Sequence, residues 1–179
     1  MVFPIVSFLS GHCRGGHGRT GTVCSVLLGA LYGLAVVDAN KVPMWEYGAL
    51  KDVLLSSPGQ GEPPNVRASA LRAIQNLAST PSNMHSIWKD AKARETLLAA
   101  AEVDEQQSVR EVALRSLCEL ANATDNLEPM WTDEGVKRVL VAKVREEQVQ
   151  QQRNMHASRV AMTKREGEIM RNAAAEELK

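Results

Sequence analysis

The stretch VRASALRAIQNLA, residues 66–78, is followed 43 residues later by a similar stretch, VREVALRSLCELA, residues 109–121. Within each stretch the leucines and alanines recur at three- and four-residue steps, which places them on one face of a helix. The tryptophans keep the same spacing, at positions 45, 88 and 131. A self-similar period of this length, built from helical patterns, predicts an α-solenoid of stacked helical repeats.

Other positions repeat in the same register and define three copies of the pattern. They are Asn40, Asn83 and Asn126; Met44, Ile87 and Met130; Lys51, Arg94 and Lys137; Leu54, Leu97 and Leu140; Leu28, Leu71 and Leu114; Leu31, Ile74 and Leu117; Leu34, Leu77 and Leu120; and Ala35, Ala78 and Ala121. We interpret Trp45, Trp88 and Trp131 as core residues that hold neighbouring helices together rather than as ligand contacts.

These copies resemble armadillo or HEAT-like repeats, through Val66-Arg67, Ala70-Leu71, Ile74 and Asn76-Leu77-Ala78. The resemblance implies a mainly α fold, a short right-handed superhelix. In armadillo proteins the Asn of the Asn-Leu-Ala step lines an inner groove that grips an extended partner. Only Asn76 matches that position here, because Gly33 and Glu119 stand at the equivalent places. We therefore do not expect a peptide groove of the usual kind.

A second motif, HCRGGHGRT at residues 12–20, precedes the first copy. Its glycines allow successive backbone N–H groups to form a concave anion-binding nest. The apolar run from Val23 to Leu34 predicts a helix whose positive N-terminal end points at the same place. Arg19 can donate to two phosphate oxygens, and the positive surroundings lower the pKa of Cys13. Such a loop suits a cysteine nucleophile that attacks phosphate esters.

Residues 12–34 resemble the signature loop of the cysteine-dependent protein tyrosine and dual-specificity phosphatases. The matching residues are His12, Cys13, Gly16, Arg19 and Thr20. The resemblance implies that Cys13 is the nucleophile, that Arg19 holds the phosphoryl group, that Thr20 eases thiolate release and that His12 orders the loop. It also implies a phosphate-binding set: Arg14, Gly15, Gly16, His17, Gly18 and Arg19. The alternative is a glycine-rich turn before a buried helix, with Cys13 as a small apolar filler.

The sequence around the loop departs from the phosphatase pattern. Ser10-Gly11 stands where the family places a bulky apolar residue, and none of the twelve residues before Cys13 is Asp or Glu. In the family an Asp before the cysteine protonates the leaving group, and a leaving alkoxide needs such an acid. Val2 to Leu9 allows at most one short strand, which would lack a ladder partner. We interpret the chain as a fragment of a longer protein or as a loop joined to another module.

The net charge and the cysteine spacing of the chain limit the classes of partner and site that we expect. Lys plus Arg and Asp plus Glu both number 21, so a net charge of zero argues against nucleic-acid and anionic-membrane partners. Cys13, Cys24 and Cys118 have no metal-ligand or disulfide spacing.

We expect no metal and no cofactor, a phosphoprotein substrate or protein partner, and a cytoplasmic or nuclear location. The function predicted is a protein phosphatase fragment on a helical-repeat scaffold; the alternative is a non-catalytic interaction scaffold. Whether the chain is an enzyme stays open.

The predicted domain organisation has three parts. Residues 1–34 form a partial phosphatase-like strand, loop and helix; residues 35–150 form the repeats; residues 151–179 form a charged helical tail. The helix from Val23 to Leu34 belongs to the loop motif and to the first copy, either because two segments are joined near Leu34-Ala35 or because one helix serves both. Helices are predicted over residues 20–37, 43–56, 65–79, 84–101, 108–123 and 129–149, with a further long exposed helix over 148–179.

Overall fold

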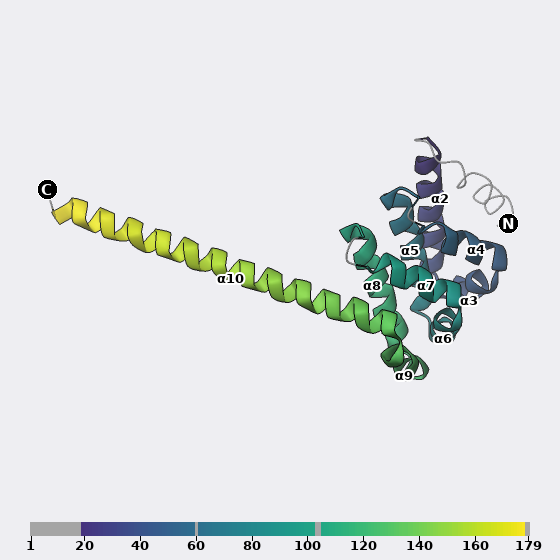
Figure 1. Cartoon of the computed structure of the whole chain (residues 1–179). Coiled ribbons are helices and arrows are strands. Elements are labelled where there is room, and N and C mark those ends of the chain that lie inside the picture. The colour runs from purple at the N-terminus through teal and green to yellow at the C-terminus, as the bar shows by residue number, and fades with distance from the viewer. Residues whose placement is uncertain (1–18, 60, 103–104, 178–179) are drawn as a thin grey trace. The chain divides into compact units, whose positions relative to one another are not determined.

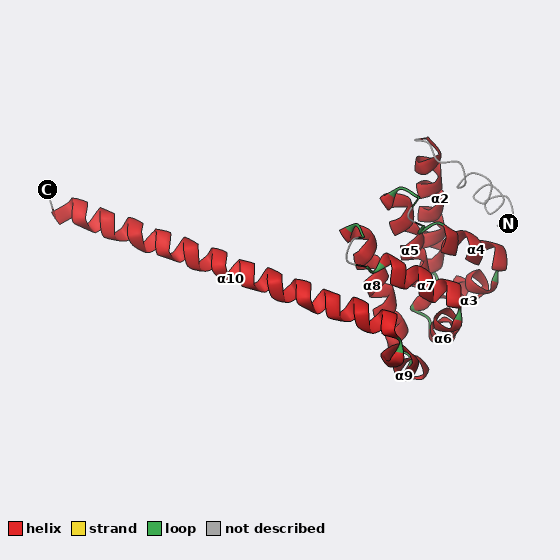
Figure 2. Ribbon diagram, viewed as in Figure 1, coloured by secondary structure: helices red, strands yellow, loops and turns green. Residues whose placement is uncertain are grey.

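The computed structural model describes residues 19–59, 61–102 and 105–177 of the chain. Figure 2 shows these residues as helices joined by loops, with no strand among them. The predicted mainly α class is therefore confirmed for the described residues, whereas the strand predicted over Val2–Leu9 lies outside them. The helices are α2 (Arg19–Val36), α3 (Asp38–Glu46), α4 (Gly48–Ser56), α5 (Pro64–Ala78), α6 (Pro81–Lys89), α7 (Ala91–Ala100), α8 (Gln107–Ala121), α9 (Thr124–Thr132) and α10 (Glu134–Glu177).

Each 43-residue copy contains three helices, not the two that the sequence predicted. The single helices predicted over 43–56, 84–101 and 129–149 are each broken, at Tyr47, Asp90 and Asp133. These three residues are extended, with ψ of 98°, 109° and 120°, so the helical hydrogen bonds cannot continue through them. The break creates a turn, and the apolar faces of the helices on both sides of it pack against neighbouring helices.

Two of the predicted helix starts are wrong. Pro43 and Pro129 lie inside α3 and α9 rather than in their first turns. Each proline removes one backbone hydrogen bond, but α3 buries Lys41 and Trp45 on either side of its proline, and this packing outweighs the loss. Pro64 does stand at the start of α5, where its missing N–H has no helical partner to lose.

The first helices of the three copies form the centre of the packed part of the chain. α5 packs against α2 and against α8, as Figure 1 shows. Leu71 and Ile74 of α5 are completely buried, and Leu28 of α2 and Val109 of α8 are equally buried. Leucine, valine and alanine therefore build the core, as close helix packing requires.

Buried asparagines tie each copy to the one before it. Asn83 donates from its side-chain amide to the carbonyls of Lys41, at 2.9 Å, and Leu77, at 3.0 Å. Asn126 donates in the same way to the carbonyls of Met84, at 3.1 Å, and of Leu120, at 2.9 Å. One bond of each pair thus stays within the copy and the other crosses to the preceding copy. A buried amide that satisfies two carbonyls fixes the register between the helices.

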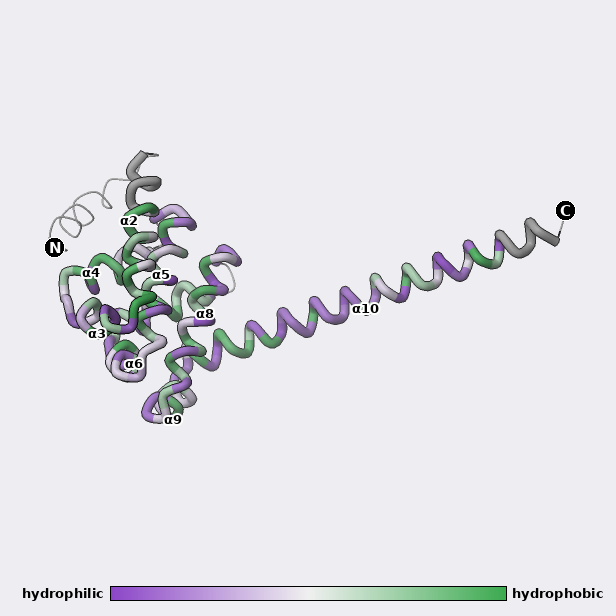
Figure 3. The backbone as a smooth tube through the Cα atoms, turned by 180° about the vertical axis from the view of Figure 1, so that it is seen from behind, coloured by the Kyte–Doolittle hydropathy of each residue, from purple (hydrophilic) through white to green (hydrophobic). Residues whose placement is uncertain are grey.

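The chain divides into two compact units, residues Met1–Val139 and Leu140–Lys179. The second unit is the long C-terminal part of α10, whose side chains are almost all exposed up to Arg171, as predicted for the tail. Figure 3 shows hydrophilic and hydrophobic residues interspersed along it. Over the described residues, no helix combines the length and the hydropathy needed to cross a membrane. The predicted division into residues 1–34, 35–150 and 151–179 stays a prediction.

Candidate functional site

The signature loop lies almost entirely outside the described residues. This holds for His12, Cys13, Arg14, Gly15, Gly16, His17 and Gly18. Arg19 and Thr20 are the first two residues of α2, described by their backbone. The helix predicted to follow the loop is therefore present, and it begins at the arginine that the resemblance assigns to phosphate binding. The predicted roles of the loop side chains stay predictions.

The helix behind the loop is held firmly in the packed unit. α2 packs along α5 and also contacts α3. Leu28, Leu31 and Ala35 are at most 1% exposed, and they recur on one face of α2. Because this face is fixed, the N-terminus of α2 has a defined direction, and with it the positive end of the helix dipole. The part of α2 from Leu28 onward is thus fixed in the packed unit.

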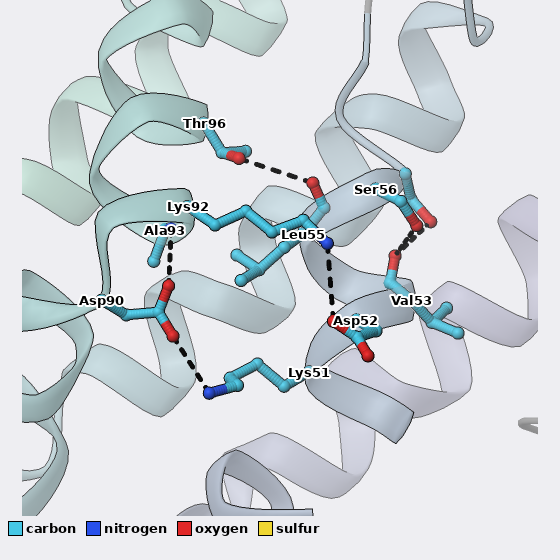
Figure 4. Close-up of polar contacts among 10 residues, drawn as sticks. Lys51, Asp52, Val53, Leu55, Ser56, Asp90, Lys92, Ala93 and Thr96 are labelled. Atoms are coloured by element: carbon cyan, nitrogen blue, oxygen red, sulfur yellow. Dashed lines mark hydrogen bonds and ion pairs between the residues drawn. The ribbon is translucent and has the colours of Figure 1, made fainter. Parts of the chain in front are cut away.

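A second cluster of polar side chains runs across the third helices of the copies (Figure 4). Lys51 of α4 donates to Asp90, the residue before α7, at 3.0 Å. Lys92 lies 3.4 Å from Asp52, and Thr96 donates to the carbonyl of Leu55 at 3.4 Å. Arg94 in turn lies 3.8 Å from Asp133, one period later. Cation and aspartate therefore pair across both junctions between copies.

The cations of this cluster also lie over the buried tryptophans. Lys51 is 5.4 Å from the ring centre of Trp45, and Arg94 is 5.6 Å from that of Trp88. A cation over an aromatic face is attracted by the negative face of the ring. Each junction thus has the same three parts: a tryptophan, a cation six residues later, and an aspartate of the following copy.

Asp90 has two structural roles at once. Its side chain accepts a hydrogen bond from the backbone N–H of Ala93 at 3.1 Å, so it caps α7 while it pairs with Lys51. Burial raises the pKa of Asp90, but the hydrogen bond and charge of Lys51 and the backbone N–H groups of Lys92 and Ala93 outweigh it and hold the pKa below its ordinary value. The carboxylate is therefore the form that the fold selects.

A buried arginine, Arg67, connects two interhelical loops. Arg67 donates through Nε to the carbonyl of Pro58 at 2.7 Å and through its guanidinium to both carboxylate oxygens of Glu105. Burial raises the pKa of Glu105, but Arg67 and the Gln106 N–H outweigh it, so that the pKa is lowered. Arg110, one period after Arg67, donates to the carbonyl of Ala101 at 3.2 Å. These arginines are structural ties between loops and helices.

The structure also places Asn76 and the third tryptophan, Trp131, both of which the sequence singled out. Asn76 is the residue that matches the groove asparagine of armadillo repeats, and it donates to the carbonyl of Tyr32 in the neighbouring helix α2 at 3.4 Å. Trp131 is 71% exposed, so its assignment to the core is wrong, although Trp45 and Trp88 are buried. The ion pairs of Asp90 with Lys51 and of Asp133 with Arg94 were not predicted. Their signal in the sequence is an aspartate that stands four residues before Arg94 and again four residues before Lys137.

Comparison with known proteins bears on the loop. Residues 7–51 match a family model described as PTP-SAK: Swiss Army Knife protein, DSP-PTPase phosphatase domain. The match contains the whole HCRGGHGRT motif and continues through α3 into α4. Neither the curated proteins nor the solved structures contain a match to the chain. The chain is thus similar to a dual-specificity phosphatase domain over this segment, and the resemblance of the loop to phosphatases is supported.

The described residues include no candidate metal site. No group of three or more His, Cys, Asp and Glu side chains there could hold a metal ion. Asp and Glu side chains in this part of the chain instead pair with Lys and Arg, as Asp90 and Glu105 do.

Proposed function

We propose that residues 12–20 form a phosphate-binding loop in which Cys13 is the nucleophile and Arg19 holds the phosphoryl group. The substrate class is a phosphoprotein, as a phosphatase domain implies in general terms. The observation that carries the proposal is the match of residues 7–51 to a dual-specificity phosphatase domain, with the full motif inside it. The start of the anchored helix α2 at Arg19 supports it, because a phosphate group binds well at such an N-terminus.

In the proposed reaction the Cys13 thiolate attacks phosphorus, an S–P bond forms and the P–O bond to the leaving group breaks. Water then attacks the phospho-cysteine, releases inorganic phosphate and restores the thiolate. Arg19 and the inward N–H groups stabilise the charge on the transferred oxygens. An alkoxide leaving group must take up a proton, whereas an aryl oxide leaves without much protonation. With no acidic residue before Cys13, we expect the 179-residue polypeptide to cleave aryl phosphates slowly and phosphoserine peptides hardly at all.

Selective alkylation of Cys13 tests the proposal. At mildly acidic pH iodoacetate should modify Cys13 first, because the loop favours the reactive thiolate. Cys118, which is exposed on α8, provides the internal reference for an accessible thiol. Vanadate should protect Cys13, and Arg19→Ala should abolish the protection. Peptide mass spectrometry gives the extent of modification at each cysteine. Equal modification of all cysteines, unaffected by vanadate, would show that the loop is only a glycine-rich turn.

A second candidate function is an armadillo-like scaffold that binds a protein partner. The observation that favours it is the recurrence of the same asparagine and cation–aspartate contacts at both junctions. The two candidates differ in what the loop contributes. A partner held by the helices alone would still bind the Cys13→Ser, Arg19→Ala double variant. A phosphoprotein held at the loop would not.

A further inference from the structure

The third copy exposes a surface whose counterparts in the first two copies are buried. Lys41 and Met84 occupy one position of the repeat and are buried, whereas Leu127, the third member, is 52% exposed. Trp45 and Trp88 are 5% and 3% exposed, whereas Trp131 is 71% exposed. The difference follows from packing: α3 contacts α5 and α6 of the next copy, and α6 contacts α8 and α9. We call Leu127, Trp131 and Lys137 the end face.

The end face keeps the polar groups that the two internal junctions use. The carbonyls of Lys41 and Met84 each accept a hydrogen bond from the asparagine of the next copy, and Leu127 is the third residue in that position. Lys51 and Arg94 each pair with the aspartate of the next copy, and Lys137 is the third cation. Lys137 itself pairs with Glu134 in the same turn, at 2.8 Å. An i, i+3 pair on an exposed helix contributes little and is easily exchanged.

We infer that the end face docks a helical segment of another polypeptide that carries an Asn and, seven residues later, an Asp at a helix N-terminus. Asn83 with Asp90, and Asn126 with Asp133, are the two such pairs that fill the internal junctions. In the complex the segment's Asn donates to the carbonyl of Leu127, its Asp pairs with Lys137, and its apolar helix face covers Trp131. Tryptophan is enriched among the residues that contribute most to binding at protein interfaces.

The same pattern argues against a second copy of this chain as the occupant. The first copy offers Asn40, but seven residues later it has Tyr47 where the other copies have aspartate. Tyrosine cannot supply the negative charge that Lys51 and Arg94 receive at the internal junctions. Continuity with those junctions and charge complementarity both favour a segment with the complete Asn–Asp pair. This inference does not depend on the phosphatase activity of the loop.

The test uses the full chain and a peptide with the sequence of residues 64–101, which carries Asn83 and Asp90. Trp88 in the peptide is replaced by Phe, so that fluorescence reports only on the protein. A second probe, residues 64–123, adds the helix that covers α5. Calorimetry measures the affinity, and acrylamide quenching measures the accessibility of Trp131, since Trp45 and Trp88 are buried. Binding should lower the quenching and shift the emission to shorter wavelength.

Charge exchange then tests the predicted orientation. Lys137→Asp should weaken binding about tenfold, close to the lower end of the coupling energies measured for close charge pairs at interfaces. An Asp90→Lys peptide should bind the Lys137→Asp protein better than it binds the unchanged protein. Lys89→Asp, which changes an exposed lysine of α6, is the matched control and should leave the affinity unchanged. Urea unfolding of each variant shows that the fold is kept.

Three results would overturn the inference. The first is that neither probe binds. The second is that a probe binds but Trp131→Ala and Lys137→Asp leave its affinity unchanged. The third is that the protein alone associates in sedimentation experiments and Trp131→Ala abolishes that association. The third result would assign the end face to a second copy of this chain.

Discussion

At the scale of single residues, position in the repeat decides the environment more than residue type does. Trp45, Trp88 and Trp131 occupy one repeat position, but only the first two have a following copy packed over them. The sequence identifies the position correctly, since the 43-residue spacing is visible without a structure. It does not show that a third copy leaves its tryptophan uncovered, because burial depends on the neighbour and not on the residue.

The tryptophans give a matched pair of variants. Trp88→Ala should lower the free energy of unfolding by about 3–5 kcal/mol, because it removes a large side chain from a packed core. Trp131→Ala should change it by about 0.5 kcal/mol or less, as expected for an exposed position. Urea denaturation followed by circular dichroism measures both. If the two variants lost similar stability, the difference in burial would not hold in solution.

At the scale of elements, the turns between helices are the least predictable feature. Residues 47, 90 and 133 lie within apolar patterns that favour one continuous helix running through each of them. Asp90 breaks the pattern because its side chain caps α7 and its charge pairs with Lys51 of the preceding copy. The second interaction is tertiary, and a reading of local sequence cannot anticipate it. In contrast, α2, α5 and α8 were predicted to within one or two residues, because each buries one long apolar face.

The cap and the ion pair of Asp90 can be separated by pH. Folding lowers the pKa of Asp90, so its charge contributes fully above the ordinary aspartate pKa. That contribution is lost as the pH falls through the lowered pKa. Asp90→Asn keeps a capping oxygen but removes the charge, so its stability should fall less steeply in this acid range. Urea unfolding at a series of pH values measures the slope. Asp125→Asn, which removes an exposed carboxylate of α9, is the matched control for the change in net charge.

At the scale of the whole molecule, the helical class and the repeat register could be predicted, whereas the chemistry of the loop could be predicted only as a motif. The register follows from side chains that pack inside each copy, such as Leu71 and Ile74. The asparagine ties were visible as a repeated column, but their partners are backbone carbonyls of the preceding copy. Every residue has a backbone carbonyl, so the sequence does not show which one a side chain binds. The role of the asparagines is therefore seen only in the packed structure.

The packing of α5 between α2 and α8 predicts that the three copies share their stability. Leu71→Ala removes a fully buried side chain of α5 and should cost about 2–5 kcal/mol. Because α5 contacts both other first helices, amide hydrogen exchange should speed up in α2 and α8 as well as in α5. The amides of residues 140–171 belong to the second compact unit and should exchange at unchanged rates, which makes them the internal control. Faster exchange confined to α5 would mean that the copies open independently.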